Sequence, residues 1–183
     1  MAAMPAVPLP DEPPGADVTG AVRIAVTGHR FFDEDTAAYI TAHVAAVLDE
    51  LTAGGAAVRV VTSLAEGADQ LVAQEAVQRG IPVEVIVPAR GYAESLAGEA
   101  DRRQYAELLV RADSVRTLDH SEPSPAAYLE AGRTMLSGTD LLIAIWDGAP
   151  ARGVGGSAEI VARGREHGLD VRVIWPPGYH RPR

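Results

Sequence analysis

Short apolar runs recur along the middle of this chain, separated by segments with helical spacing and by turns rich in glycine. The runs lie at residues 22–27, 58–64, 83–87, 115–118, 140–146 and 171–175. Most are apolar on both faces, which is typical of strands in a parallel sheet that helices cover on both sides. The sequence therefore predicts an α/β fold: a single doubly wound, Rossmann-like domain with a parallel sheet of about six strands and helices on both faces.

The segments between these runs carry helix signals. Asp33 and Asp35 are candidate N-caps of a first helix, which ends at Gly54 and has its apolar side chains on one face. A second helix is expected from Ala68 to Gly80. Further helices are expected at about 101–112, 126–137 and 157–167.

Composition indicates how the chain is organised. Its 183 residues are 47% hydrophobic, which suits one domain with a sizeable core. We expect a Pro-rich disordered leader at 1–20, the domain at 21–177 and a tail at 178–183. The leader lacks the basic start and apolar stretch of a signal peptide, and no apolar run is long enough to span a bilayer. We therefore expect a cytoplasmic protein with no membrane partner.

The net charge and the lack of cysteine indicate which classes of partner and cofactor to expect. The chain has 16 Lys and Arg against 25 Asp and Glu, a net charge of −9. Proteins that bind nucleic acids usually show a basic footprint, so the charge argues against a nucleic acid partner. With no cysteine and no histidines at metal-binding spacing, the sequence predicts no metal site and no cofactor.

The turns that follow the strands form the candidate site, because ligands of doubly wound sheets lie beyond the carboxyl ends of the strands. The first such turn contains Gly28, His29 and Arg30. Glycine lets the backbone turn tightly, and an Arg guanidinium can donate two hydrogen bonds to a phosphate. Taken alone, these residues fit an ordinary turn with a surface Arg better than a phosphate site.

The second candidate turn follows the predicted strand at 58–64. Ser63, Glu66, Gly67 and Asp69 stand where the next helix begins, and the free amides of a helix start attract anions. Glu66 and Asp69 either cap that helix themselves or accept hydrogen bonds from ligand hydroxyls, such as those of a ribose. The residues alone do not decide between these two roles.

The third candidate turn, at residues 147–159, is the richest in glycine. Its candidate residues are Asp147, Gly148, Gly153, Gly155, Gly156, Ser157 and Glu159. Glycines directly before a helix place backbone amides in a concave arrangement that suits a phosphate. Ser157 either caps the helix or donates its hydroxyl, and Glu159 meets the helix dipole or faces the ligand. This placement favours phosphate binding over a merely flexible loop.

Several common motifs are absent or misplaced. GVGGSA matches the dinucleotide fingerprint G-x-G-x-x-A, but it lies in the last βα unit, and Asp170 precedes the final strand instead of ending it. An NAD-dependent oxidoreductase is therefore disfavoured. Neither a P-loop motif nor the G-x-S-x-G elbow of serine hydrolases occurs.

Three stretches together resemble the SLOG superfamily: VTGHR, then SLAEGADQLVAQEAVQRGIPVEVIVP, then DLLIAIWDG with GVGGSAEIVARGREHGLDVRVIWPP. This superfamily groups Rossmann-like proteins related to the LONELY GUY phosphoribohydrolases, formerly described as lysine decarboxylase-like, and to the DNA-processing protein of bacterial transformation. The resemblance covers most of residues 22–177 and is weakest at 88–125. It implies binding of a nucleotide or nucleotide derivative, and a homo-oligomer that associates through its helices.

The resemblance also implies a reaction, with departures from the family pattern. In the LONELY GUY branch, water cleaves the N-glycosidic bond of a nucleoside 5′-monophosphate, and the motif is P-G-G-x-G-T-x-x-E. Gly156, Ser157 and Glu159 match its second half loosely, whereas Trp146-Asp147-Gly148 and a longer loop replace its first half. The family's arginine falls at Ala131, with Arg133 two residues further on.

Two functions follow from the sequence. The first is a nucleotide-binding sensor or carrier, with the phosphate on the third turn. The alternative is a phosphoribohydrolase-like enzyme in which Glu159 is the catalytic carboxylate and Asp147 or Glu66 the second one, assisted by Arg30 or Arg133. The displaced arginine favours binding over hydrolysis.

Overall fold

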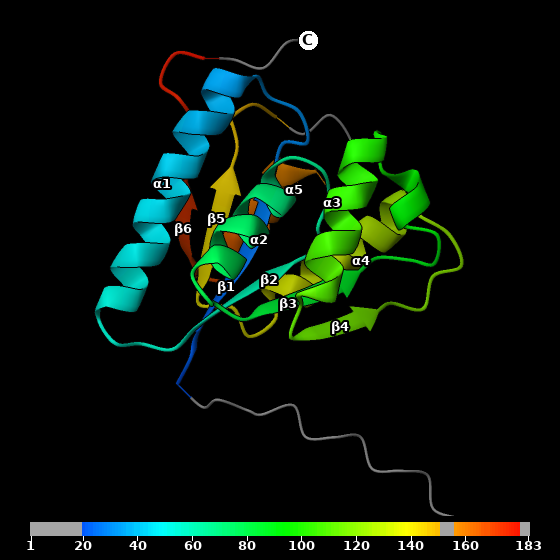
Figure 1. Cartoon of the computed structure of the whole chain (residues 1–183), viewed down its shortest axis with the longest axis horizontal. Helices are drawn as coiled ribbons and strands as arrows, with labels where there is room; N and C mark the ends of the chain where they lie inside the picture. The colour runs from blue at the N-terminus through cyan, green and yellow to red at the C-terminus, as the bar shows by residue number, and fades with distance from the viewer. Residues whose placement is uncertain (1–19, 151–155, 180–183) are drawn as a thin grey trace, which may run out of the picture.

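The computed structural model describes residues 20–150 and 156–179, in which six strands form one parallel sheet (Figure 1). The strands are β1 (Val22–Gly28), β2 (Val58–Thr62), β3 (Val83–Val87), β4 (Ser114–Thr117), β5 (Leu141–Ile145) and β6 (Asp170–Val173). The helices are α1 (Glu34–Ala53), α2 (Ala68–Gln78), the short 3-10 helix η1 (Ala93–Ser95), α3 (Glu99–Val110), α4 (Pro125–Leu136) and α5 (Ser157–Glu166). The predicted α/β, doubly wound, single-domain fold is confirmed.

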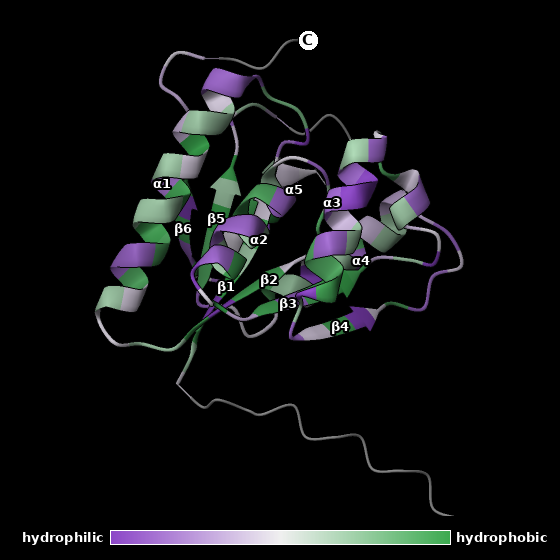
Figure 2. Ribbon diagram, in the orientation of Figure 1, coloured by the Kyte–Doolittle hydropathy of each residue, from purple (hydrophilic) through white to green (hydrophobic). Residues whose placement is uncertain are grey.

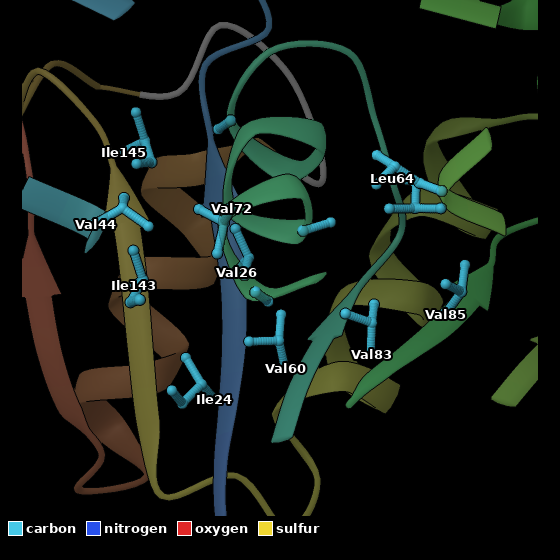
Figure 3. Packing of buried hydrophobic residues seen from close by; sticks show 14 of the residues in the cluster. Ile24, Val26, Val44, Val60, Leu64, Val72, Val83, Val85, Ile143 and Ile145 are labelled. Atoms are coloured by element: carbon cyan, nitrogen blue, oxygen red, sulfur yellow. The ribbon is translucent and has the colours of Figure 1, made fainter. Parts of the chain in front are cut away.

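Helices cover both faces of the sheet, because side chains along each strand alternate between two apolar cores. α1 and α2 pack on one face, against Ile24 and Val26 of β1 and Ile143 of β5 (Figure 3). α3 lies beside α2 and contributes to the same core. α4 and α5 pack on the other face, against Ala25 and Ala144. Figure 2 shows the central strands as largely hydrophobic, whereas the helices carry hydrophilic residues as well. The central strands are therefore buried on both sides, as the continuous apolar runs predict.

The order of the strands, β4-β3-β2-β1-β5-β6, contains one reversal, which lies between β1 and β5. From β1 the chain moves outward through β2 and β3 to β4, and it then returns to pair β5 with the other side of β1. The register joins Ile24 to Leu141 and Gly28 to Ile145, so both strands end at the same level. Doubly wound sheets bind ligands outside the carboxyl ends of the strands at such a reversal.

Most element boundaries follow the signals in the sequence. α1 begins after Asp33, whose carboxylate accepts the Thr36 amide at 2.8 Å, so the N-cap prediction is confirmed. The run at 58–64 is shorter as a strand, because Leu64 adopts a positive φ of 56° beyond the end of β2. The chain leaves the sheet there and turns toward α2.

The last strand, β6, begins at Asp170, one residue before the predicted run, and ends at Val173. Beyond it, the Ile174 amide still donates to the Ala144 carbonyl at 2.9 Å. The chain then continues to Trp175, which lies at the carboxyl edge of the sheet beside the first turn. None of the helices in the described ranges is long and apolar enough to cross a membrane.

Candidate functional site

A buried histidine–aspartate pair joins the turns after β1 and β5. His29 Nε2 lies 2.9 Å from Asp147 Oδ1, and the Ala149 amide donates to the same oxygen at 3.0 Å. The His29 and Asp147 side chains are only 5% and 2% exposed. Two residues 118 positions apart in sequence thus meet across the reversal of the sheet. The first and third predicted turns therefore begin side by side.

Close packing around Gly28 holds the end of β1 against its neighbours. A Cβ atom at Gly28 would overlap the Cβ atoms of Ala68 and Ile145. The His29 amide donates to the Ile145 carbonyl, and the His29 carbonyl accepts the Ala68 amide. The end of β1 is thereby bonded both to the end of β5 and to the start of α2. A larger residue at Gly28 would force these three segments apart.

The turn between β2 and α2 is held together by Asp69. The Asp69 carboxylate accepts the Thr62 hydroxyl at 2.9 Å and the Ser63 amide at 3.0 Å. Burial raises the pKa of Asp69 from its ordinary 3.8 to about 6, although these hydrogen bonds and the charge of Arg30 act in the opposite direction. Asp69 therefore supports the shape of the turn.

The same turn depends on unusual backbone conformations. Gly67 has a φ of +82°, and a Cβ atom there would overlap the carbonyl group of Arg30. Leu64 is the one non-glycine residue with a positive φ in the described parts of the chain. Such conformations persist only where the surrounding structure imposes them. Here they bring the β2–α2 connection against the turn after β1.

Arg30 and Glu66 form an ion pair where these two turns meet. Arg30 Nη1 lies 3.2 Å from Glu66 Oε1; the Glu66 side chain is 3% exposed and the Arg30 side chain 41%. Burial lowers the pKa of Arg30. The nearby Glu66, Tyr92 and Tyr128 have the opposite and larger effect, so the pKa of Arg30 is raised. The second carboxylate oxygen of Glu66, Oε2, is buried and has no hydrogen-bond partner.

Two tyrosines complete this group, which we name the Arg30 cluster: Arg30, Glu66, Tyr92 and Tyr128. The Arg30 guanidinium lies over the Tyr128 ring, 5.5 Å from its centre. Tyr92 packs edge-on against Tyr128, with ring centres 6.2 Å apart. Burial, then the charge of Asp69, raises the pKa of Tyr92 well above its ordinary value. Neither tyrosine was predicted as a site residue, because neither belongs to a candidate turn.

The turn between β5 and α5 is described at its two ends. Gly148 is exposed and has a φ of +80°. Gly156 is the N-cap of α5, without a side-chain hydrogen bond to cap it, and Ser157 is the first residue of the helix. The predicted glycines Gly153 and Gly155 lie outside the described residues. α5 also contacts β1, where Ile160 and Val161 lie in the same apolar core as Ala25.

Three further predicted residues lie in different surroundings. Glu159, in the first turn of α5, pairs with Arg163 at 2.9 Å. Ser63 is buried, and its hydroxyl donates to the Met135 sulfur at 3.5 Å. Arg133 lies exposed on α4. Within residues 20–150 and 156–179, no three His, Asp or Glu side chains are grouped to hold a metal ion.

Solved structures share this architecture, although sequence comparison finds no match. The sequence matches no protein-family model and no curated protein. DNA processing protein A from Streptococcus pneumoniae superposes with a TM-score of 0.60 at 19% identity, over 84% of this chain and 50% of that one. The same protein from Helicobacter pylori gives 0.57 at 16% identity, over 85% of this chain and 66% of that one. The chain therefore shares the Rossmann-like fold of these two proteins.

The chain thus spans between half and two thirds of the length of these two relatives. The likeness is one of fold, and it confirms the architecture that the resemblance implies. In this chain, the Rossmann-like fold brings the turns after β1, β2 and β5 to one edge of the sheet. At that edge lie the His29–Asp147 pair and the Arg30 cluster.

Proposed function

We propose that this SLOG-fold protein binds a nucleotide or nucleotide derivative, as a sensor or carrier, at the carboxyl edge of β1, β2 and β5. The His29–Asp147 pair supports this function most, because it joins two turns at the reversal of strand order. Ligands of doubly wound sheets bind at that position. Arg30 and the start of α5 extend from the same two turns.

Two features of this edge would attract an anionic phosphate group. α5 begins after Gly156, which has no side chain to cap the helix, and the first amides of a helix attract anions. The Arg30 guanidinium is oriented by Glu66 and Tyr128, and a substantial part of its side chain is exposed. An arginine held in this way can donate paired hydrogen bonds to phosphate oxygens. Because the whole chain carries a charge of −9, such local positive groups decide whether an anion binds.

Isothermal titration calorimetry with AMP, cyclic AMP and ADP-ribose tests the proposed function. We expect saturable binding of at least one of them, weakened about tenfold or more in Arg30→Gln, because a charge-assisted hydrogen bond contributes about 1.5–3 kcal/mol. Arg165→Gln, which removes an exposed arginine from the last turn of α5, is the matched control and should keep the affinity. If none of the three compounds binds saturably, the proposal is wrong.

Hydrolysis of nucleoside 5′-monophosphates is the second function that the site supports. Glu159 lies in the first turn of α5 with its side chain 29% exposed. A carboxylate in that position can stabilise the positive charge of an oxocarbenium-like transition state while water attacks the ribose carbon and the base leaves. Asp147 would be the second carboxylate.

Chromatography of protein incubated with AMP tests hydrolysis, since water would release adenine and ribose 5-phosphate. If the protein is a hydrolase, the wild-type protein releases adenine and Glu159→Gln does not. A wild-type protein that binds AMP but releases no adenine would refute hydrolysis and leave binding in place.

Single-stranded DNA is a third ligand to test, because a DNA-binding mode is described for the Helicobacter pylori relative. The net charge of −9 opposes it. Retention of a labelled oligonucleotide at about 0.15 M salt would favour DNA over a free nucleotide.

A further inference from the structure

A buried carboxylate oxygen in the Arg30 cluster lacks a hydrogen-bond donor. Oε1 of Glu66 faces Arg30 Nη1 at 3.2 Å, whereas Oε2 is buried without a partner. Among the described residues, it is the one side-chain acceptor in this condition; the other unpartnered buried atoms are the Nε donors of Arg23 and Arg163. A buried acceptor without a donor costs free energy, and such groups are rare in folded proteins.

Two charged side chains beside Glu66 already have partners. Arg30 donates to Oε1 and stacks over Tyr128. The neighbouring carboxylate of Asp69 accepts hydrogen bonds from its own turn, at Thr62 and Ser63. No described residue donates a hydrogen bond to Oε2, so a bound molecule that donates one there would satisfy it. Within the ion pair, the side chain of Arg30 is the partly exposed one, so solvent reaches the pair on the Arg30 side.

Charge decides which part of a nucleotide can supply that donor. A carboxylate repels a phosphate group, which offers hydrogen-bond acceptors and negative charge. Sugar hydroxyls donate a hydrogen bond to a carboxylate readily. The position of Glu66 also suits a sugar hydroxyl. Glu66 follows β2, and β2 flanks β1 on the side opposite β5. A ligand with its phosphate at the start of α5 would extend its sugar across the end of β1 toward Glu66.

We propose that Glu66 accepts a hydrogen bond from a ribose hydroxyl through Oε2, and that the ligand is therefore a ribonucleotide and not a deoxyribonucleotide. This inference rests on the proposed nucleotide-binding function and names the class of ligand. Arg30 positions the carboxylate by holding Oε1, while Tyr128 keeps the guanidinium in place.

The test compares AMP with 2′-deoxy-AMP and 3′-deoxy-AMP by calorimetry, in the wild-type protein and in Glu66→Gln. Gln has the size of Glu but places an amide donor where the ligand hydroxyl needs an acceptor. We expect the wild-type protein to bind AMP at least about tenfold more tightly than one of the two deoxy compounds, as for a hydrogen bond to a charged group. In Glu66→Gln this ratio should fall to about one.

The ratio of affinities within one variant does not depend on how much of that protein is folded, so it separates recognition from stability. Glu94→Gln, which changes an exposed glutamate in η1, is the matched control and should keep the wild-type ratio. IMP, which lacks the amino group of the adenine base, is a further arm. Weaker binding of IMP with equal binding of all three adenine compounds would assign Oε2 to the base and overturn the ribose assignment.

The remaining outcomes are equally distinct. Equal affinity of the wild-type protein for AMP and both deoxy compounds refutes the role of Glu66 and leaves the proposed nucleotide binding intact. A ribose preference that persists in Glu66→Gln refutes the assignment to this residue. If no nucleotide binds at all, the proposed function fails and this inference fails with it.

Discussion

Replacing Asp69 by Asn should remove a pH dependence of stability that the buried carboxylate imposes. Burial at the start of α2 raises the pKa of Asp69 from 3.8 to about 6. The folded state therefore binds this proton more tightly than the unfolded state does. The stabilisation that protonated Asp69 gives is complete below pH 3.8 and is lost as the pH rises through about 6.

The pKa difference sets the size of the effect. One pKa unit corresponds to about 1.4 kcal/mol, so ionising Asp69 costs the folded protein about 3 kcal/mol. Asn has the same shape and no charge. The free energy of unfolding of the wild-type protein, measured relative to Asp69→Asn, should thus fall by about 3 kcal/mol between about pH 3.5 and about pH 7.

Urea denaturation at a series of pH values measures this difference directly. Asp119→Asn is the matched control, because the Asp119 side chain is fully exposed, and its stability should follow that of the wild-type protein at every pH. A difference between the wild-type protein and Asp69→Asn that stays constant across this pH range would refute the reasoning. It would mean that the folded and unfolded states bind the Asp69 proton equally well.

Two further changes test how the candidate site is built. Gly67→Ala should lower the free energy of unfolding by about 1–3 kcal/mol more than Gly55→Ala, because both glycines have a positive φ but only Gly67 also lacks space for a Cβ atom. Equal losses in urea denaturation would show that the Arg30 carbonyl does not restrict this position. His29→Ala should lower the unfolding free energy by about 1–3 kcal/mol, because it removes a partner of the buried Asp147 carboxylate. Unchanged stability would contradict a structural role for the pair.

The elements of this fold could be predicted because each is encoded by neighbouring residues. Asp33 caps α1 through an amide three positions away, and the continuous apolar run of β5 is buried throughout. The order of the strands could not be predicted in this way. It depends on β1 pairing with β5, as in the contact of Ile24 with Leu141, and no local pattern records which strand returns to β1.

The candidate site was predictable to the extent that glycine marks close approaches of the backbone. Gly28 and Gly67 stand where a Cβ atom would overlap a neighbouring segment, and both turns were predicted as site. Tyr92 and Tyr128 were not, because they reach Arg30 from a loop after β3 and from α4. The sequence left two roles open for Glu66 and Asp69, and only atomic contacts distinguish them. Asp69 accepts hydrogen bonds from its own turn, whereas Glu66 keeps one oxygen without a hydrogen bond.

The bond between His29 and Asp147 also bears on how the chain folds as it is synthesised. β1 leaves the ribosome before β5, so the edge of β1 that pairs with β5 has no partner until Leu141–Ile145 emerge. The turn after β1 is joined to Asp147 only later still. A nascent chain therefore exposes an unpaired edge of a strand that becomes central in the finished sheet. A chain whose synthesis stops before β5 has neither the complete sheet nor the second half of the proposed binding edge. We therefore expect such a truncated chain not to bind the ligand.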